Sequence, residues 1–477
     1  MTTTKAVIMV GGGSRGTRFR PLSLDRAKIL FPIAGKPLLA HTVDAILEID
    51  SIKEIILIGF YEPSVFTEFL SQFAARMKYS KRECTMRYLK EFKALGTAGG
   101  LYYFKNEIMS GSPDNFFVIH GDIVCSFPLQ KMIDFYEQKT RENGSKKLDA
   151  ILMGVQIQNY DVFLALNDRD QSSFGTIISD AKSKKVVHYV EKPETKMSDT
   201  INGGVYMFNG MLFKRLSHAK VTKITAASTN PEYVDEDVIS MEKDILENLP
   251  EFGNTYVYPY TGFFAALKTP SDALYANQLY LNALQQKQRT GRSEAGSPIS
   301  AIPLGHKRTS TLDRVTLEKP SATIIPPVFI HPSSSIDKAM GTKIGPYVSI
   351  GPGCKIEAGS RISNSIILHK SHIGENSLVR NSIISYGCKA GKWTRIEGTG
   401  VTIKKSNKKP AGPQKPVESG ACQIIGIKDS GNISILGSGT NVNDDAYILN
   451  SFILPNKNIR HDIKYESIMK GGEQVCI

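Results

Sequence analysis

Near the N-terminus the chain reads Ala6-Val7-Ile8-Met9-Val10-Gly11-Gly12-Gly13-Ser14-Arg15-Gly16-Thr17-Arg18. The apolar run indicates a buried β-strand, and the glycines after it allow backbone N–H groups to approach an anion without a Cβ in the way. Arg15 and Arg18 add forked positive charge at the same place. The spacing matches neither the dinucleotide motif G-x-G-x-x-G nor a P-loop that ends in G-K-[ST]. This stretch therefore predicts an α/β sheet with a polyphosphate-binding loop after its first strand.

From residue 5 to about 284, short apolar runs such as Ile55–Ile58 and Phe116–Ile119 alternate with amphipathic stretches. This alternation is typical of a Rossmann-like α/β domain with a mostly parallel sheet. Ligands of such sheets bind beyond the carboxyl ends of the strands. We therefore expect one domain over residues 1–284, with the glycine-rich loop and Asp122 at its ligand-binding edge.

The second half of the chain has a different period. Isoleucines recur every six residues at Ile344, Ile350, Ile356 and Ile362, and the pattern continues less regularly at Ile367, Ile373, Val379, Ile384, Ile433 and Ile448. A six-residue period with small turn residues indicates a parallel β-helix whose isoleucines stack inside. The sequence predicts this domain over residues 312–477, and Trp393 is expected to cap or pack it.

Two polar stretches interrupt this organisation. Residues 285–311 contain Gln-Gln, Gly, Ser and Pro with little apolar periodicity, which predicts a linker or disordered insertion. Residues 398–432 are rich in Gly, Pro, Lys and Ser and predict a loop that projects from the β-helix.

The composition excludes several classes of protein. The net charge is +13, but lysines and arginines concentrate in 287–308 and 404–415, without a nucleic-acid-binding motif. No apolar run approaches the ~18 residues of a membrane span, and the first strand begins too early for a signal peptide. Six scattered cysteines without a C-x-x-C pair disfavour a zinc site. We expect a cytoplasmic protein that binds anionic small molecules, not nucleic acid or membrane.

Several polar residues follow predicted strands or glycine-rich turns. Lys28 is close enough to the first loop to reach a bound polyphosphate, or is a surface lysine. The turn Leu95-Gly96-Thr97-Ala98-Gly99-Gly100 could hold a base through its backbone, or is a plain turn. Asp122 could bind Mg²⁺ or cap a turn, whereas His120 is expected to be structural.

Two later motifs complete this set. Glu191-Lys192-Pro193 places a cation at a strand end for a phosphate, and Asn202-Gly203-Gly204 offers an amide and open backbone for sugar hydroxyls.

These motifs, in this order, resemble the mannose-1-phosphate guanylyltransferase (GDP-mannose pyrophosphorylase) family. The resemblance rests on G-T-R-F-R-P-L-S at 16–23, L-G-T-A-G-G at 95–100, Asp122, V-E-K-P at 190–193, N-G-G-V-Y at 202–206 and the hexapeptide repeats. It implies a nucleotidyltransferase domain followed by a left-handed β-helix. It also implies a Mg²⁺-supported attack of mannose 1-phosphate on the α-phosphate of GTP, which yields GDP-mannose for glycosylation and pyrophosphate.

The resemblance also assigns site residues. It gives Gly11, Gly12, Gly16, Thr17 and Arg18 to the triphosphate, and Leu95, Gly96, Thr97 and Gly99 to guanine. Arg18, Lys28 and Asp122 would be catalytic, with Asp122 on the metal. The mannosyl side would contain Glu191, Lys192, Asn202 and Gly204.

The sequence departs from active members of the family in three places. The glycine-rich loop is two residues longer, and Lys28 has lost the prolines on both sides, which should leave it less firmly positioned. The family segment G-F-W-x-D-I-G reads Gly262-Phe263-Phe264-Ala265-Ala266-Leu267-Lys268, so Ala266 replaces the second metal-binding aspartate. Asp272 is the one nearby carboxylate that could substitute.

The departures resemble the alpha-type subunit, which implies a GDP-mannose-binding regulator of a catalytic beta-type subunit, weak or inactive alone, with self-association. The alternative is an active Mg²⁺-dependent guanylyltransferase. A third possibility, an acyltransferase with His331 or His369 as base, rests only on the β-helix.

Overall fold

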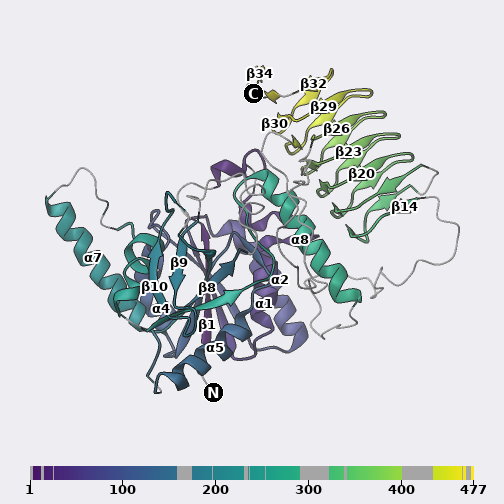
Figure 1. The fold of residues 1–477 in the computed structure, drawn as a ribbon. Helices are drawn as coiled ribbons and strands as arrows, with labels where there is room; N and C mark the ends of the chain where they lie inside the picture. Colours follow the sequence, from purple (N-terminus) through teal and green to yellow (C-terminus); the bar gives the residue numbers. More distant parts are fainter. Residues whose placement is uncertain are drawn as a thin grey trace, which may run out of the picture.

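The computed structural model describes residues 4–11, 16–24, 26–144, 146–157, 174–195, 197–229, 235, 237–252, 254–289, 322–337, 341–399, 433–464, 466–468 and 474–476. They form an α/β domain and a stack of short strands, with a long helix between the two (Figure 1). Both domains agree with the predicted fold class. No helix in the described ranges is both long and apolar enough to cross a membrane.

The α/β domain is built on a nine-stranded mixed sheet in which the path β10-β9-β11-β6-β1-β4-β5 is joined by β8 and β12. Strands β6, β1, β4 and β5 are parallel, β11 is antiparallel to β6 and β8, and β12 is parallel to β8. The strands span β1 Thr4–Gly11, β4 Ile52–Gly59, β5 Thr85–Lys90, β6 Asn115–His120, β8 Ala150–Gln156, β9 Thr176–Ser179, β10 Val186–Val190, β11 Thr200–Phe208 and β12 Thr255–Tyr260.

Helices cover both faces of this sheet. Along β1 the side chains of Ile8 and Val7 point to opposite faces, and both are fully buried. This is why the strand sequences are continuously apolar. One face packs against α1 (Leu38–Leu47), α2 (Ser64–Ser80) and α5 (Leu129–Glu142), and the other against α3 (Gly99–Tyr103), α4 (Lys105–Met109) and α7 (Met211–Thr229).

The second domain is a parallel β-helix with three sheets, as the six-residue period predicts. One sheet holds β14 (Thr323–Ile324), β17 (Lys343–Ile344), β20 (Arg361–Ser363), β23 (Leu378–Arg380), β26 (Arg395–Glu397), β29 (Tyr447–Leu449) and β32 (Ile463–Lys464). The next holds β15 (Val328–Ile330), β18 (Val348–Ile350), β21 (Ile366–Ile367), β24 (Ser382–Ile384), β27 (Ser434–Leu436), β30 (Phe452–Ile453), β33 (Glu466–Ile468) and β34 (Gln474–Cys476). The third holds β16 (Ser335–Ile336), β19 (Lys355–Ile356), β22 (His372–Ile373), β25 (Lys389–Ala390), β28 (Asn441–Val442) and β31 (Asn458–Ile459).

The predicted isoleucines form three inner stacks. Ile344 pairs with Ile362, and the same stack continues through Val379, Ile396, Ile448 and Ile463. Ile433 differs from the prediction. It belongs to the core shared with the α/β domain, while Leu436 takes the inner position three residues later.

Helix α8 (Pro270–Arg289) joins the two domains, and it continues past residue 284 into the predicted linker. Asn277, fully buried on this helix, accepts hydrogen bonds from the backbone N–H of Ala34 at 3.0 Å and from Ser349 Oγ at 2.6 Å. The outward side chains Ile366 and Ile383 share one apolar core with α8. The two domains therefore pack through a common core. Residues 290–321, which include the rest of the linker, lie outside the described part of the chain.

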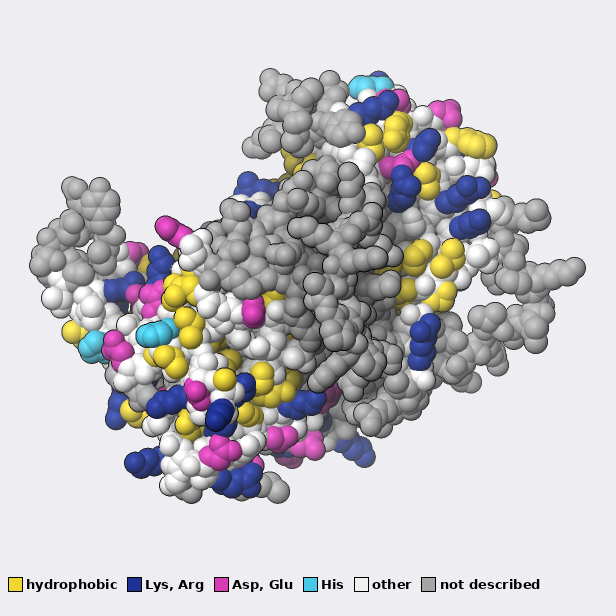
Figure 2. Space-filling view, in the orientation of Figure 1, with side chains coloured by type: hydrophobic (Ala, Val, Ile, Leu, Met, Phe, Trp, Pro, Cys, Tyr) yellow, Lys and Arg dark blue, Asp and Glu magenta, His cyan; other side chains and the backbone are white. Residues whose placement is uncertain are grey.

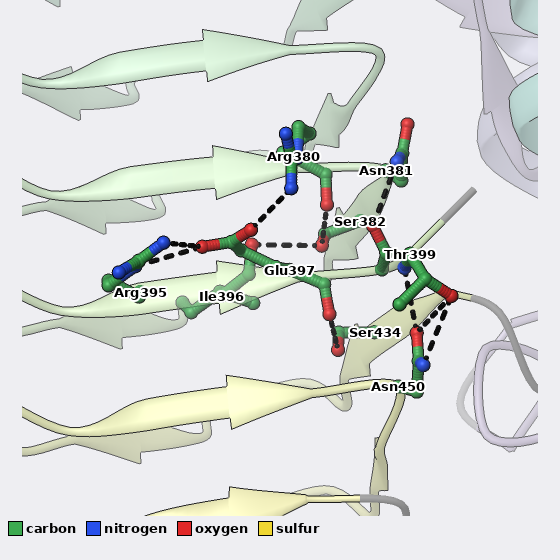
Figure 3. A network of polar contacts seen from close by, with 10 residues as sticks. Arg380, Asn381, Ser382, Arg395, Ile396, Glu397, Thr399, Ser434 and Asn450 are labelled. Carbon is green, nitrogen blue, oxygen red and sulfur yellow. Dashed lines mark hydrogen bonds and ion pairs between the residues drawn. The ribbon is translucent and has the colours of Figure 1, made fainter.

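The predicted loop 398–432 leaves the β-helix between β26 and β27, and residues 400–432 lie outside the described part. Its two ends are fixed by the network in Figure 3. The Glu397 carboxylate, 3% exposed, pairs with Arg380 at 2.7 Å and Arg395 at 2.7 Å. Ser434 Oγ donates to the Glu397 carbonyl at 2.6 Å, and the Thr399 N–H donates to Asn450 at 2.9 Å.

On the face of the β-helix that Figure 2 shows, Lys and Arg side chains lie with hydrophobic side chains between them. Trp393 does not pack the β-helix as expected, because it is 61% exposed at a corner where the backbone has φ +58°. The equivalent corners of the neighbouring coils carry Asn376 and Asp445, also at positive φ.

Candidate functional site

A pocket of about 220 Å³ opens where β1, β4, β5 and β6 end. This is the edge at which ligands of parallel sheets bind. The pocket brings together residues that were predicted from widely separated motifs. Its lining consists of Met9, Val10, Gly11, Gly16, Thr17, Arg18, Lys28, Ile29, Tyr61, Glu91, Gly96, Thr97, His120, Asp122 and Lys268.

The first wall of the pocket is formed by the two ends of the glycine-rich loop. Gly11 and Gly16 have φ +134° and +68°, a backbone region that side chains disfavour. Gly16 precedes a short 3₁₀ turn, Thr17–Phe19, which places exposed Arg18 at the pocket. Gly12 and the two additional residues of the loop lie outside the described part of the chain.

Lys28 is held firmly despite the loss of its flanking prolines. It begins a second 3₁₀ turn, Lys28–Leu30. Its ammonium donates to Asp122 Oδ2 at 2.8 Å and to the carbonyl oxygen of Leu267 at 2.8 Å. Burial alone would raise the pKa of Asp122, but Lys28, His120 and Lys268 lower this pKa to about 2. Asp122 is therefore ionised, and one of its oxygens is occupied by a lysine.

Ala266 lies beside Asp122, where the resemblance places a second carboxylate. Strand β13 (Phe264–Ala266) pairs with β7 (Ile123–Cys125), which sets Ala266 opposite Ile123. The N–H of Leu267 donates to the carbonyl oxygen of Asp122 at 2.7 Å. Two residues after Ala266, Lys268 lines the pocket and places a second ammonium near Asp122.

These residues do not fit a magnesium site. Mg²⁺ requires oxygen ligands in near-octahedral geometry and is usually held by one or two carboxylates together with substrate phosphates. Asp122 and Glu91 are the two carboxylates that line the pocket; Asp122 faces the ammonium of Lys28, and Lys268 adds repulsion. Within the described ranges there is no group of three or more His, Cys, Asp or Glu that could hold a metal.

Asp272 does not replace the missing carboxylate. Its Oδ2 accepts hydrogen bonds from the N–H groups of Lys268 at 2.8 Å and Thr269 at 2.6 Å. These bonds cap the start of α8, as carboxylates at helix N-termini commonly do. Asp272 is also not among the residues that line the pocket.

Another part of the pocket wall is the turn that the resemblance assigns to guanine. Gly96, at φ +81°, and Thr97 line the pocket. The turn is fixed by two hydrogen bonds, from the N–H of Ile239 to the Leu95 carbonyl at 3.0 Å and from the N–H of Ala98 to the Ile239 carbonyl at 2.9 Å. Leu95 is buried beneath it, and Gly99 packs against the backbone of Asp237, so both support the turn from behind.

Glu91 also lines the pocket, although it belongs to none of the motifs predicted from the sequence. It follows β5, is 1% exposed, and its Oε1 has no hydrogen-bond partner among the described residues. Burial raises the pKa of this carboxyl to about 7. The signal that could have found it is the one used for Asp122, a carboxylate directly after an apolar strand.

The residues assigned to mannose form a hydrogen-bonded chain next to the pocket. Tyr189 Oη donates to Glu191 Oε2 at 2.9 Å, and the Asn202 amide donates to Tyr189 Oη at 3.1 Å. Asn202 Oδ1 accepts from the Gly204 N–H at 3.0 Å. Gly204, at φ +64°, packs against His120, whereas Lys192 is largely exposed.

His120 links this chain to the pocket. Its Nε2 is buried without a hydrogen-bond partner in the described residues and lies 4.0 Å from Glu242 Oε1. Glu242 in turn accepts a hydrogen bond from Thr97 Oγ1 at 2.7 Å. His120 was expected to be a satisfied structural residue, but its ring faces the pocket with an unused polar atom.

Comparison with known proteins agrees with this architecture. Residues 5–245 match the Nucleotidyl transferase family and residues 324–469 match the GMPPB C-terminal domain. The chain is 34% identical over 473 residues to a probable mannose-1-phosphate guanyltransferase of Schizosaccharomyces pombe, covering 98% of this chain and 100% of that protein.

Two further relatives carry regulatory names. The mannose-1-phosphate guanylyltransferase regulatory subunit alpha of Xenopus tropicalis is 34% identical, over 98% of this chain and 100% of its own length. The protein of the same name from Dictyostelium discoideum is 33% identical, over 98% and 99%. The chain therefore belongs to the mannose-1-phosphate guanylyltransferase family, and its relatives include members named as regulatory alpha subunits.

Proposed function

We propose that this chain is an alpha-type regulatory subunit, which binds GDP-mannose in the cytoplasm and restrains a catalytic beta-type guanylyltransferase subunit. The names of the Xenopus and Dictyostelium relatives support the regulatory role. The pocket between Arg18, Lys28 and the Gly96–Thr97 turn supports retention of a nucleotide-sugar site.

The chemistry of guanylyl transfer explains why catalysis would be weak. An oxygen of mannose 1-phosphate forms a bond to the α-phosphorus of GTP while the bond to pyrophosphate breaks. Such reactions depend on positioning and on neutralising charge around the phosphates, a role in which metal ions recur. The observation that carries the proposal is Ala266 beside Asp122, with Lys268 two residues on.

The same groups favour a bound diphosphate. Arg18, Lys28 and Lys268 are cations that line one pocket, so they can neutralise the phosphates of GDP-mannose without a metal. GDP-mannose carries fewer negative charges than GTP and therefore requires less neutralisation. The pocket is thus better suited to a receptor for the product than to the binding of GTP.

The test combines calorimetry with a turnover assay on the purified chain. We expect GDP-mannose to bind, and pyrophosphate release from GTP, mannose 1-phosphate and Mg²⁺ to stay at background. Lys268→Gln should weaken GDP-mannose binding about tenfold, whereas Lys182→Gln, at an exposed turn lysine that does not line the pocket, should not. Robust turnover by the isolated chain would contradict the proposal and favour an active guanylyltransferase.

A test of the proposed regulation requires the catalytic subunit. Added GDP-mannose should inhibit a mixture of the catalytic subunit with the wild-type chain more strongly than a mixture with Lys268→Gln. Equal inhibition in both mixtures would show that this pocket does not transmit the signal.

A further inference from the structure

The exposed indole of Trp393 is the starting point, because neither the pocket nor the core of the β-helix uses it. The side chain is 61% exposed, and the backbone has φ +58°, a conformation that bulky residues rarely adopt. Strained backbone positions of this kind cluster at functional sites. The coils before and after carry Asn376 and Asp445 at the same corner. A tryptophan thus occupies a position at which the fold itself favours a small polar residue.

The backbone of this corner is fixed from both sides. The Trp393 N–H donates to the Glu375 carbonyl at 2.8 Å in the coil before. In the coil after, Asp444 Oδ1 accepts from the Lys392 N–H at 2.7 Å, and the Asp445 N–H donates to the Lys392 carbonyl at 2.9 Å. The indole is therefore presented on a rigid support, and a partner that buries it does not have to order the backbone first.

Arg395, two residues after Trp393, belongs to a row of outward side chains on the sheet that contains β17, β20, β23, β26 and β29. The strand register aligns these side chains on successive coils, and the residue after each of them points inward to the apolar core. Neighbouring strands lie about 4.8 Å apart, so the row extends over roughly 19 Å. Its members are Lys343, Arg361, Leu378, Arg395 and Tyr447. We call this row, together with Trp393 and Arg380, the basic face.

The basic face carries an excess of positive charge. Arg380 and Arg395, with side chains 51% and 59% exposed, share the buried carboxylate of Glu397 (Figure 3). One carboxylate neutralises only one of the two guanidinium groups. Within the described ranges, Lys343 and Arg361 are exposed and form no ion pair. Four cations and one carboxylate therefore leave three positive charges on this face.

Aromatic and aliphatic groups lie among these charges. The centroid of the Tyr447 ring is 5.3 Å from the guanidinium carbon of Arg395 and 5.1 Å from Lys464 Nζ, so cation–π contacts orient the ring. Leu378 lies in register between Arg361 and Arg395. Trp, Tyr and Arg are the residue types that contribute most to binding at protein–protein interfaces. This composition is typical of an interface whose partner supplies carboxylates around an apolar pocket.

A second copy of this chain does not fit the basic face. A twofold contact would set the face against itself and bring the three positive charges of each copy together. The chain carries a net charge of +13, so contact with another of its surfaces would also oppose like net charges. An acidic region of a different protein is favoured, and under the proposed function that protein is the catalytic subunit.

We propose that the basic face docks onto an acidic surface of the catalytic subunit, with the Trp393 indole inserted into an apolar pocket of that subunit. This rests on the proposed function, which requires such a subunit. It also explains the strain at Trp393, because the tryptophan is disfavoured in the free chain and becomes buried only in the complex.

The test measures association of the purified chain with the catalytic subunit by sedimentation velocity. Trp393→Asn should weaken association at least about tenfold, as expected for a central anchor. Because this variant relieves the backbone strain, the loss cannot be ascribed to unfolding. Lys343→Glu/Arg361→Glu should weaken association more at about 50 mM salt than at about 300 mM. The control Lys131→Glu/Lys182→Glu makes the same charge change at exposed lysines of the α/β domain and should alter the affinity less than about threefold.

Fluorine NMR gives a direct readout, because Trp393 is the one tryptophan of the chain. Incorporation of fluorotryptophan gives a single resonance. Addition of the unlabelled catalytic subunit should shift this resonance and remove its response to replacement of H₂O by D₂O, which marks burial of the indole. All variants should bind GDP-mannose as wild type does, since the basic face does not line the pocket.

Four outcomes would overturn this assignment. Trp393→Asn and the charge-reversal variant could both keep the wild-type affinity, or the fluorine resonance could stay unchanged in the complex. A changed oligomeric state of isolated Trp393→Asn would assign the face to a second copy. Competition by a mixed-sequence DNA duplex for the catalytic subunit's place would assign it to nucleic acid. A wild-type chain that binds GDP-mannose but never associates with the catalytic subunit would instead reject the proposed function.

Discussion

The ammonium of Lys28 lies 2.8 Å from Oδ2 of Asp122, so a lysine occupies the carboxylate on which the family resemblance places a metal. The same ammonium reaches the Leu267 carbonyl at 2.8 Å, next to Ala266. The carboxylate is thus already neutralised by a cation of the chain, and Lys268 adds a further positive charge near it.

Binding of GDP-mannose should not depend on divalent metal. Because Lys28 and Lys268 supply positive charge where the second carboxylate is missing, the Kd should change less than about twofold between excess EDTA and excess Mg²⁺. Calorimetry in both buffers measures this. The double variant Ala266→Asp/Lys268→Gly restores the family pattern and should make binding respond to Mg²⁺. Strong weakening of the wild type by EDTA would contradict the prediction.

The ion pair of Asp122 should stabilise the fold in a pH-dependent way. The pKa of Asp122 is about 2 in the folded protein and 3.8 for an unperturbed aspartate, so the stabilisation is present above pH 4 and is lost as the pH falls through 2. Its magnitude is about 2 kcal/mol. Urea unfolding followed by far-UV circular dichroism should place Asp122→Asn below wild type at pH 7. A difference of the same size at pH 2 would be inconsistent with this origin.

Ionisation of Glu91 should lower the stability of the fold, whereas ionisation of Asp122 raises it. The pKa of Glu91 is about 7 in the folded protein and 4.5 for an unperturbed glutamate, so the folded state holds the proton more tightly and stability falls as the pH rises from 4.5 through 7. Without ligand, Glu91→Gln should therefore be more stable than wild type at pH 8, by about 2–3 kcal/mol, and nearly equal at pH 4. Urea unfolding at both pH values measures this. A variant less stable than wild type at pH 8 would reject the assigned burial cost.

The ion pairs of Glu397 with Arg380 and Arg395, at the start of the 398–432 segment, should stabilise the β-helix. Glu397→Gln leaves Arg380 and Arg395 without their shared carboxylate, and we expect a loss of about 1–2 kcal/mol. Trp393, the one tryptophan of the chain, reports unfolding of this domain by fluorescence. The control Glu375→Gln breaks a surface pair with Lys392, in which both side chains are about half exposed, and should cost less than about 0.5 kcal/mol. Equal losses in both variants would argue against a special role of Glu397.

Trp393 itself should destabilise its corner. A bulky side chain at φ +58° is strained, and the same corner in adjacent coils carries Asn376 and Asp445, residue types that tolerate this conformation. Trp393→Asn should therefore raise stability by about 0.5–1 kcal/mol, measured by thermal melts with circular dichroism. Trp393→Ala keeps the disfavoured backbone conformation and should show no such gain. A less stable Trp393→Asn would mean that the indole makes favourable contacts.

The fold was largely predictable because it depends on periodicity. The six-residue spacing of Ile344 and Ile350 specifies the inner stacks, and the apolar run at Phe116 specifies a strand buried on both faces. Periodicity was insufficient at single positions. Ile433 is apolar and near the expected register, yet it belongs to the core shared between the two domains and not to the β-helix interior.

Site residues could be predicted where a motif ends a strand, as at Asp122. They were harder to predict where packing between distant segments determines the position of a side chain. Lys28 was expected to be loosely held, because the sequence does not reveal that the Leu267 carbonyl and Asp122 converge on its ammonium. Glu91 was missed because its burial depends on Gly100, which comes from another element. Trp393 was expected to pack because tryptophan usually does, whereas its backbone conformation directs it outward.

The hydrogen bond from Ser434 Oγ to the Glu397 carbonyl ties the end of β26 to the start of β27. The β-helix brings the two ends of the intervening segment together, so the segment itself does not have to close the chain. Lengthening such a loop costs only about 0.6 kcal/mol for each doubling. The segment between β26 and β27 can therefore be exchanged during evolution. It is also a site at which a foreign sequence can be inserted without changing the coils on either side.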